Sequence, residues 1–255
     1  LFVLGTVGFS ATVGGDVLFE LARPAQASVL SGADLAWPLA SANPGALGFR
    51  TGWEFVSTYF SPFGAGHLGH LALLAPGLAA EALLFHAEVG PWLSYRAEGG
   101  ALGLGLAAGA LGLGGRARLL HLAQPAEGLG AALDLGFLWQ GFFWLGGLAK
   151  NVWSKPAFPD EAWPLDFSGA IALPLRLFGL QLYVGAAAQD LLTLPRYACA
   201  LALEAGVLSL ATSLGSTGLA LGGSLSWSSF RLEWAFLSHA HLPLSFRVSL
   251  AWRWP

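Results

Sequence analysis

The sequence predicts an all-β protein, a transmembrane antiparallel β-barrel of about 14 strands with an N-terminal arm in its lumen. Three observations support this fold. Of the 255 residues, 55% are hydrophobic and only 11% are charged, which is too apolar for an ordinary soluble domain. The apolar stretches hold many of the 35 glycines, and glycine weakens helices but is tolerated in barrel walls. Apolar residues alternate with small or polar ones, as in strands with one face toward lipid.

The first 50 residues differ in pattern from the rest of the chain. Residues 1–11 form an apolar stretch that ends on small residues, which is typical of the end of a secretory signal peptide. A first strand or a luminal segment is the alternative for this stretch. Residues 12–50 are predicted to form a luminal arm, with a short helix over 22–32 and a turn at Asn43, Pro44 and Gly45.

Residues 51–255 are predicted to form the barrel, in fourteen segments that alternate between two faces. An even number of strands is typical of bacterial barrels. The pair of segments between 101 and 122 is the least regular, which leaves a count of twelve open. The segments lie near 53–60, 66–74, 79–88, 101–110, 112–122, 128–138, 141–150, 165–173, 176–186, 196–204, 206–214, 217–227, 229–237 and 243–254.

Both ends of the barrel chain are expected on the periplasmic side of the membrane. Odd-numbered strands then run outward, and every second loop lies outside the cell. The main outer loops are expected at 61–65, 89–100, 151–164 and 238–242. The loop 151–164, rich in proline and tryptophan, is the longest of them.

The last three predicted strands show the alternation best, with large apolar side chains on one face and small or polar ones on the other. An arginine on the lipid side would cost roughly 2–4 kcal/mol at mid-membrane, so charged residues should face the lumen. We expect them to pair with one another or with the arm, either as a charge ladder that fills the lumen or as a polar binding path. The charged residues on the polar faces are Asp134, Arg231, Glu233, Arg247 and Arg253.

Three other basic residues group near strand ends. Arg116 and Arg118 share a face, and with Lys150 they could meet an anionic group. Anchoring at the membrane interface is the expected role, because basic residues commonly sit at that depth.

Residues that could support catalysis or metal binding are sparse. The spacing of His239 and His241 permits metal binding, but no Asp, Glu or Cys lies beside them, so no metal site is expected. The single cysteine excludes an intrachain disulfide, and the net charge of -3 argues against a nucleic-acid partner. No cofactor and no enzymatic activity are expected, because the candidates for a hydrolase site lie on strands that are not predicted to pair. Those candidates are Ser209, Ser213, His86 and His121.

Five passages, in a fixed order along most of the chain, carry a resemblance to a known family. They are residues 14–21 followed by 25–32, then 42–45, 131–136, 149–152, and 232–236 followed by 245–250. In this order they resemble the FadL-related outer-membrane proteins, and within them the PorV and PorQ type associated with type IX secretion. The chain departs from the family where Gly45, in place of the usual alanine, follows Pro44.

The resemblance implies a fourteen-stranded barrel in the bacterial outer membrane, surrounded by outer-membrane lipid, with an N-terminal arm inside it. It implies first a binding or docking component of protein secretion, whose outer loops would bind secretion-system proteins. The alternative is a FadL-like passive channel for uptake of hydrophobic small molecules, with an apolar pocket beside the arm. The lumen is expected to be too obstructed for a general porin.

Overall fold

Fourteen antiparallel strands form one closed barrel in the structure, a computed structural model that describes residues 17–37, 42–62, 66–88, 94–124, 126–216, 218–238 and 244–254. Each strand pairs with its neighbours in sequence, and β1 pairs with β14 to close the ring. The strands are β1 (Trp53–Ser61), β2 (Gly66–Ala75), β3 (Leu78–Glu88), β4 (Ser94–Ala108), β5 (Leu111–Gln124), β6 (Gly128–Gln140), β7 (Trp144–Lys155), β8 (Asp166–Leu177), β9 (Leu180–Gln189), β10 (Arg196–Ala205), β11 (Leu208–Gly215), β12 (Gly218–Trp227), β13 (Phe230–Leu237) and β14 (Ser245–Trp254).

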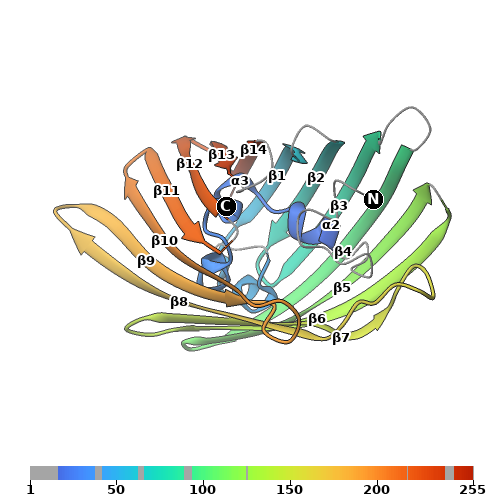
Figure 1. Cartoon of the computed structure of the whole chain (residues 1–255). Helices are drawn as coiled ribbons and strands as arrows, with labels where there is room; N and C mark the ends of the chain where they lie inside the picture. The colour runs from blue at the N-terminus through green and yellow to red at the C-terminus, as the bar shows by residue number, and fades with distance from the viewer. Residues whose placement is uncertain are drawn as a thin grey trace.

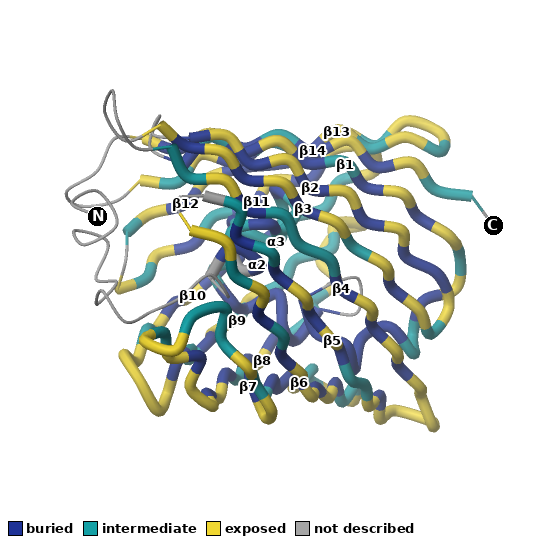
Figure 2. The backbone as a smooth tube through the Cα atoms, turned by 90° about the vertical axis from the view of Figure 1, so that its right-hand side faces the viewer, coloured by how far each residue is buried: buried dark blue, intermediate teal, exposed yellow. Residues whose placement is uncertain are grey.

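Exposed and buried residues alternate along the strands, as the bands in Figure 2 show. On β4 the outward side chains of Leu102, Leu104 and Leu106 are 68%, 64% and 81% exposed, whereas Ala101 is buried. The exposed positions around the barrel are mostly leucine, isoleucine, valine and aromatic residues. Such a surface is stable only against lipid, because water would be in contact with a continuous apolar belt.

Aromatic side chains gather where β1 begins and β14 ends. The rings of Trp53 and Trp254 stack with centroids 6.3 Å apart, and Phe230 stacks on Trp252 at 6.1 Å. Aromatic girdles of this kind lie at the membrane interface in barrels. This group therefore marks one edge of the apolar belt.

The arm, named here as residues 17–37 and 42–50, lies within the ring of strands (Figure 1). It contains two five-residue helices and two 3-10 helices, which are α2 (Val17–Leu21), α3 (Ala25–Val29), η1 (Ala33–Ala36) and η2 (Pro44–Phe49). Helices this short are unstable alone, so their conformation depends on packing against the wall. None of the described helices has the length and apolar character that a transmembrane helix needs.

The observed strands confirm the predicted fold class, and their number rules out the alternative of twelve. Two loops are shorter in the structure than the sequence predicts. Strand β4 begins at Ser94, within the expected loop 89–100, and β7 continues to Lys155, within the expected loop 151–164. The error has a physical reason: beyond the apolar belt the outward positions become polar, as at Arg96 and Glu98, while strand pairing continues.

Some expectations fall on parts of the chain outside the described residues. These include residues 1–16, which contain the signal-peptide stretch, and most of the loops expected at 61–65 and 238–242. His239 and His241 also lie there.

Candidate functional site

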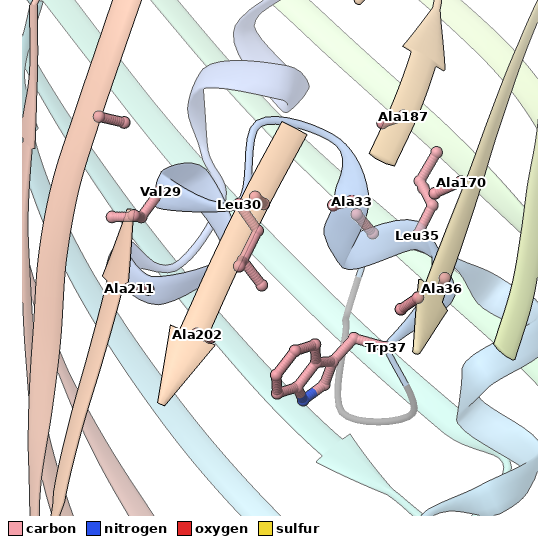
Figure 3. Packing of buried hydrophobic residues seen from close by; sticks show 14 of the residues in the cluster. Val29, Leu30, Ala33, Leu35, Ala36, Trp37, Ala170, Ala187, Ala202 and Ala211 are labelled. Atoms are coloured by element: carbon pink, nitrogen blue, oxygen red, sulfur yellow. The ribbon is translucent and has the colours of Figure 1, made fainter. Parts of the chain in front are cut away.

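The arm fills the lumen through three apolar clusters at different depths. In the largest, residues from Ala25 to Trp37 pack on wall residues that are nearly all alanine (Figure 3). Leu18 and Phe19 of α2 form the second cluster near the end of β1, and Leu47 of η2 forms the third near its start. Small wall side chains let the arm backbone approach closely, so the clusters leave little space. The wall residues labelled in Figure 3 are Ala170, Ala187, Ala202 and Ala211.

The β7–β8 loop covers the lumen at the end away from Trp53 and Trp254. Trp163 is 3% exposed and belongs to the same apolar cluster as Phe19. Ser154 donates a hydrogen bond to the carbonyl oxygen of Trp163 at 2.8 Å, which holds the loop against β7. This loop, which the sequence predicts to be the longest outer loop, therefore folds over the lumen.

An aromatic group lies where η1 ends. The ring of Trp37 lies 4.0 Å from that of Tyr183 and 6.1 Å from that of Trp144, measured between centroids. The hollow beside Trp37 and Tyr183 has a volume of only about 10 Å³. This hollow has room for about one water molecule, so it is far smaller than the apolar pocket expected beside the arm.

Helix α3 is held to the wall by polar contacts. The backbone N–H of Ala25 donates to Oγ of Ser249 at 2.9 Å, and that of Gln26 donates to Oε2 of Glu233 at 3.1 Å. The side chain of Gln26 donates to Oγ of Ser209 at 3.3 Å. The first N–H groups of a helix lack partners within it, so the wall supplies the cap that Pro24 does not.

The residues on either side of α3 add two further polar contacts. Oγ of Ser31 lies 2.7 Å from Oγ of Ser213 on β11. Arg247 on β14 donates from Nη1 to the carbonyl oxygen of Arg23 at 2.7 Å, and its guanidinium lies 4.1 Å from the ring centroid of Phe60. Arg247 is 2% exposed. The arm thus supplies the oxygen that accepts a hydrogen bond from this buried cation.

Helix η2 is held differently, by close contact with strand glycines. A Cβ atom built on Gly114 would lie 2.3 Å from the carbonyl oxygen of Pro44, and one on Gly105 would lie 2.4 Å from the same oxygen. A Cβ on Gly136 would lie 2.4 Å from Oδ1 of Asn43. Only glycine permits this approach of backbone to backbone. The glycines of β4, β5 and β6 therefore form a seat for η2.

Asn43, Pro44 and Gly45 begin η2, where the sequence predicted a turn. Asn43 is fully buried, and its amide donates to the carbonyl oxygens of Leu35 at 2.6 Å and Phe137 at 2.8 Å. Its Oδ1 accepts from the N–H of Gly45 at 3.0 Å. One side chain thus caps η2 and connects it to η1 and to the wall.

A charged cluster surrounds Glu54 at the base of the arm. Its carboxylate accepts hydrogen bonds from Arg50, Arg231 and Arg253, each at 2.9 Å. Arg231 also pairs with Glu233 at 2.7 Å. This set of three arginines and two glutamates joins the end of the arm to β1, β13 and β14. Because Glu233 also accepts from α3, the cluster is connected to the arm at two points.

A second charged cluster lies between β2 and β7. Arg118 pairs with Asp134 at 2.7 Å, and Arg116 pairs with Glu81 at 2.8 Å. His70 contacts Glu81 at 3.2 Å. The ring of Phe19 lies within 5.6 Å of both guanidinium carbons, so α2 packs on the arginines. Arg116 and Arg118 were expected at the interface, but both are buried in the lumen because their strand places them on its inward face.

The five charged candidates from the sequence all lie on inward faces, but they do not form one site. Asp134 belongs to the second cluster, Arg231, Glu233 and Arg253 belong to the Glu54 cluster, and Arg247 contacts the arm. Sequence reasoning missed Glu54, Glu81, His70 and Arg50. Glu54 and His70 occupy inward positions of their strands, so the alternation that found Arg231 could also have found them.

Other chemical groups are dispersed among the described residues. Ser209 and Ser213 point into the lumen, whereas His86 and His121 lie on the outer face of β3 and β5. No group of three or more His, Cys, Asp or Glu residues in the described ranges could hold a metal ion.

Comparisons with known proteins find a similarity of fold among solved structures. No protein-family model matches the sequence, and no curated protein matches it. The crystal structure of the outer membrane protein Omp33 of Acinetobacter baumannii matches with a TM-score of 0.51 and 11% identity, over 81% of this chain and 100% of that one. A mutant of TodX, described as a monoaromatic hydrocarbon channel, has a TM-score of 0.49 and 11% identity, with 83% and 92% covered. The KdgM porin has a TM-score of 0.45 and 7% identity, with 80% and 100% covered.

A closed barrel with an even number of strands and a continuous apolar outer surface defines a class, the transmembrane barrels of the outer membrane. The match to Omp33 supports the same fold. The protein is therefore an outer-membrane β-barrel of bacterial type, with its lumen occupied by its own N-terminal arm.

Proposed function

We propose that the barrel is a gated channel for small apolar molecules, in which the part of the arm from α2 to α3 moves aside while η1 and η2 stay seated. The observation that supports this is the difference in attachment. Side-chain hydrogen bonds that water can replace connect α3 to the wall, whereas η1 and η2 lie against strand glycines. A Cβ atom built on Gly146, for example, would lie 1.9 Å from the carbonyl oxygen of Leu35 in η1. Both ends of the barrel chain would lie on the periplasmic side.

The lining that such a movement would uncover suggests the class of molecule. The wall around α3 is mainly alanine. A passage lined in this way favours apolar solutes over ions or sugars, because it offers few hydrogen-bond partners.

A disulfide lock tests the gate. Oγ of Ser31 and Oγ of Ser213 lie 2.7 Å apart, so paired cysteines at these positions are close enough to bond. The variant is Ser31→Cys with Ser213→Cys, made in a Cys199→Ser background, and each single cysteine serves as a matched control. Uptake of a small fluorescent naphthylamine by bacteria making the oxidised double variant should fall to the level of cells without the barrel. Reduction should restore uptake, and equal uptake before and after reduction would exclude the gate.

A second proposal is a docking component of protein secretion, which the PorV and PorQ resemblance implies. It is supported by the uneven height of the wall. Strands β4, β5 and β6 have 15, 14 and 13 residues, whereas β11 and β13 have 8 each, so one side of the barrel rises above the other. The β7–β8 loop folds beside this taller side. A partner protein could bind there while the lumen stays closed.

Co-purification from mild detergent separates the two proposals. A docking protein should retain a stoichiometric protein partner in the disulfide-locked variant, because its outer surface is unchanged. Loss of that partner after replacement of residues 156–162 by a short glycine and serine linker would assign binding to the loop. A locked barrel that blocks uptake and retains no partner would favour the channel alone.

A further inference from the structure

The outer wall carries an apolar groove over β8 to β11, next to the β6–β7 turn. Its volume is about 660 Å³, within the range of about 300–1,000 Å³ that is typical of ligand sites. The groove lies on the outward face, because Ile171, Val184, Leu201 and Leu214 are 43–67% exposed and belong to the apolar belt. It therefore opens on the lipid side of the wall, opposite the lumen.

Small residues make the wall concave there. The outward side chains at the centre are Ala186 and Cys199, which are direct cross-strand partners. Larger outward side chains flank them in register, with Ile171 beside Ala186 and Leu214 beside Cys199. Phe142 and Phe143 of the β6–β7 turn line one end. The result is a trough with two short side chains as its floor and large apolar side chains around it.

The groove offers an occupant almost no polar partner. The hydroxyl of Thr212 donates to the carbonyl oxygen of Ala220 at 3.1 Å, so it is already bonded. Ser213, the other hydroxyl of the lining, points inward and contacts Ser31. Strand backbone groups are bonded within the sheet, which leaves apolar contact as the main source of binding energy.

We propose that this groove binds one acyl chain of a membrane phospholipid as a retained, stoichiometric ligand. The argument for this occupant is continuity: the groove is part of the apolar belt that faces the bilayer, so acyl chains meet it without leaving their own layer. A flexible chain fills a trough that the rigid wall cannot fill itself, and it supplies the dispersion attraction that the lining of an empty trough would lack.

The experiment compares two substitutions of the same kind on the outer face. Ala186→Leu fills the floor of the groove, whereas Ala82→Leu adds the same side chain to an exposed outward position of β3. The full-length barrel, reconstituted with dipalmitoyl phosphatidylethanolamine, is released from the bilayer and stripped stepwise in native mass spectrometry. The wild-type barrel and Ala82→Leu should retain one phospholipid after the others are lost. Ala186→Leu should retain none, and an equal count in all three would overturn the proposal.

A measurement on the wild-type chain keeps the proposal testable if Ala186→Leu fails to fold. A phospholipid with a photoreactive diazirine on its acyl chain is irradiated with the barrel in nanodiscs. Adducts should concentrate on the peptide that contains Cys199, and excess unlabelled phospholipid should reduce them at least tenfold. Adducts spread evenly over the outward strands, including the peptide that contains Ala82, would show ordinary lipid contact and would overturn the proposal.

Discussion

Two parts of the same arm are attached to the wall by different physical means. Helix α3 contacts β11 to β14 through the apolar side chain of Val29 and through single hydrogen bonds to side chains such as Ser249 and Glu233. Helix η2 contacts β3 to β6 through backbone that lies against glycines. A side-chain hydrogen bond contributes about 1 kcal/mol net and can be exchanged with water, whereas close packing cannot be replaced piecewise. The comparison indicates that η2 is the fixed part of the arm and that α3 is the part that can be released.

The largest effect should come from adding a side chain to the seat of η2. Gly114→Val would place its Cβ 2.3 Å from the carbonyl oxygen of Pro44, so η2 must shift. We expect a loss of about 3 kcal/mol in the free energy of unfolding, measured by urea titration in lipid vesicles. Gly69→Val is the matched control, because a Cβ there meets nothing within 4 Å. Equal effects of the two substitutions would show that η2 is not seated as described.

Removal of the Asn43 side chain should have the next largest effect. Asn43→Ala leaves the buried carbonyl oxygens of Leu35 and Phe137 without this donor and removes the cap on the N–H of Gly45. We expect a loss of about 2 kcal/mol in the same titration. Ser28→Ala removes a hydroxyl that bonds only carbonyl oxygens in and just before α3, and it should change stability by less than about 0.5 kcal/mol. A loss for Asn43→Ala no greater than that for Ser28→Ala would contradict the tie between η2 and the wall.

Loosening of α3 alone should leave the barrel intact and expose the arm. Ser249→Ala removes the acceptor for the N–H of Ala25 and also a contact with Thr58 on β1. Loss of the Ala25 contact costs about 1 kcal/mol, which corresponds to a roughly fivefold increase in the open population. The rate of chymotryptic cleavage after Leu30 should rise by that factor. Thr58→Val, which removes the Thr58 contact alone, should leave the cleavage rate unchanged and should have the same urea midpoint as Ser249→Ala. A lower midpoint in Ser249→Ala than in Thr58→Val would show that α3 stabilises the whole barrel.

The smallest effect should be a dependence of arm docking on pH. Asp34 in η1 is 1% exposed, and burial raises its pKa, although Arg23 at 3.5 Å acts in the opposite direction. A raised pKa in the docked state means that docking is favoured below the ordinary value of about 3.9 and weakens as the pH rises above it. Hydrogen exchange of the backbone of residues 25–37, corrected for its intrinsic dependence on pH, should increase as the pH rises. Asp34→Asn should remove the dependence, and an unchanged slope in that variant would exclude Asp34 as its source.

The barrel was predictable because lipid imposes one strict rule on every spanning strand. Leu102 and Leu104 face lipid and Gly103 faces the arm, so alternation located β4 even among glycines. The rule fails where lipid ends, which is why alternation predicts loops in place of the upper parts of β4 and β7. The same alternation predicted that Arg231 and Asp134 face the lumen, but it did not predict which side chains they contact. Glu54 lies 177 residues before Arg231 in the chain. Arg118 pairs with Asp134 diagonally, not with its direct cross-strand neighbour Ala132, so strand spacing alone does not fix which side chains meet.

The arm's position also constrains the order in which the molecule can be assembled. Its residues precede all strands in the chain, and the seat of η2 is complete once β6 is in place. Ala25 of α3 bonds Ser249, and Arg23 just before α3 bonds Arg247, and both partners lie on β14, the last strand. Helix α3 therefore cannot dock fully until the first and last strands are brought together. A docked α3 therefore indicates that the barrel is closed. In an incompletely closed barrel the arm should stay undocked, where a protease can cleave it.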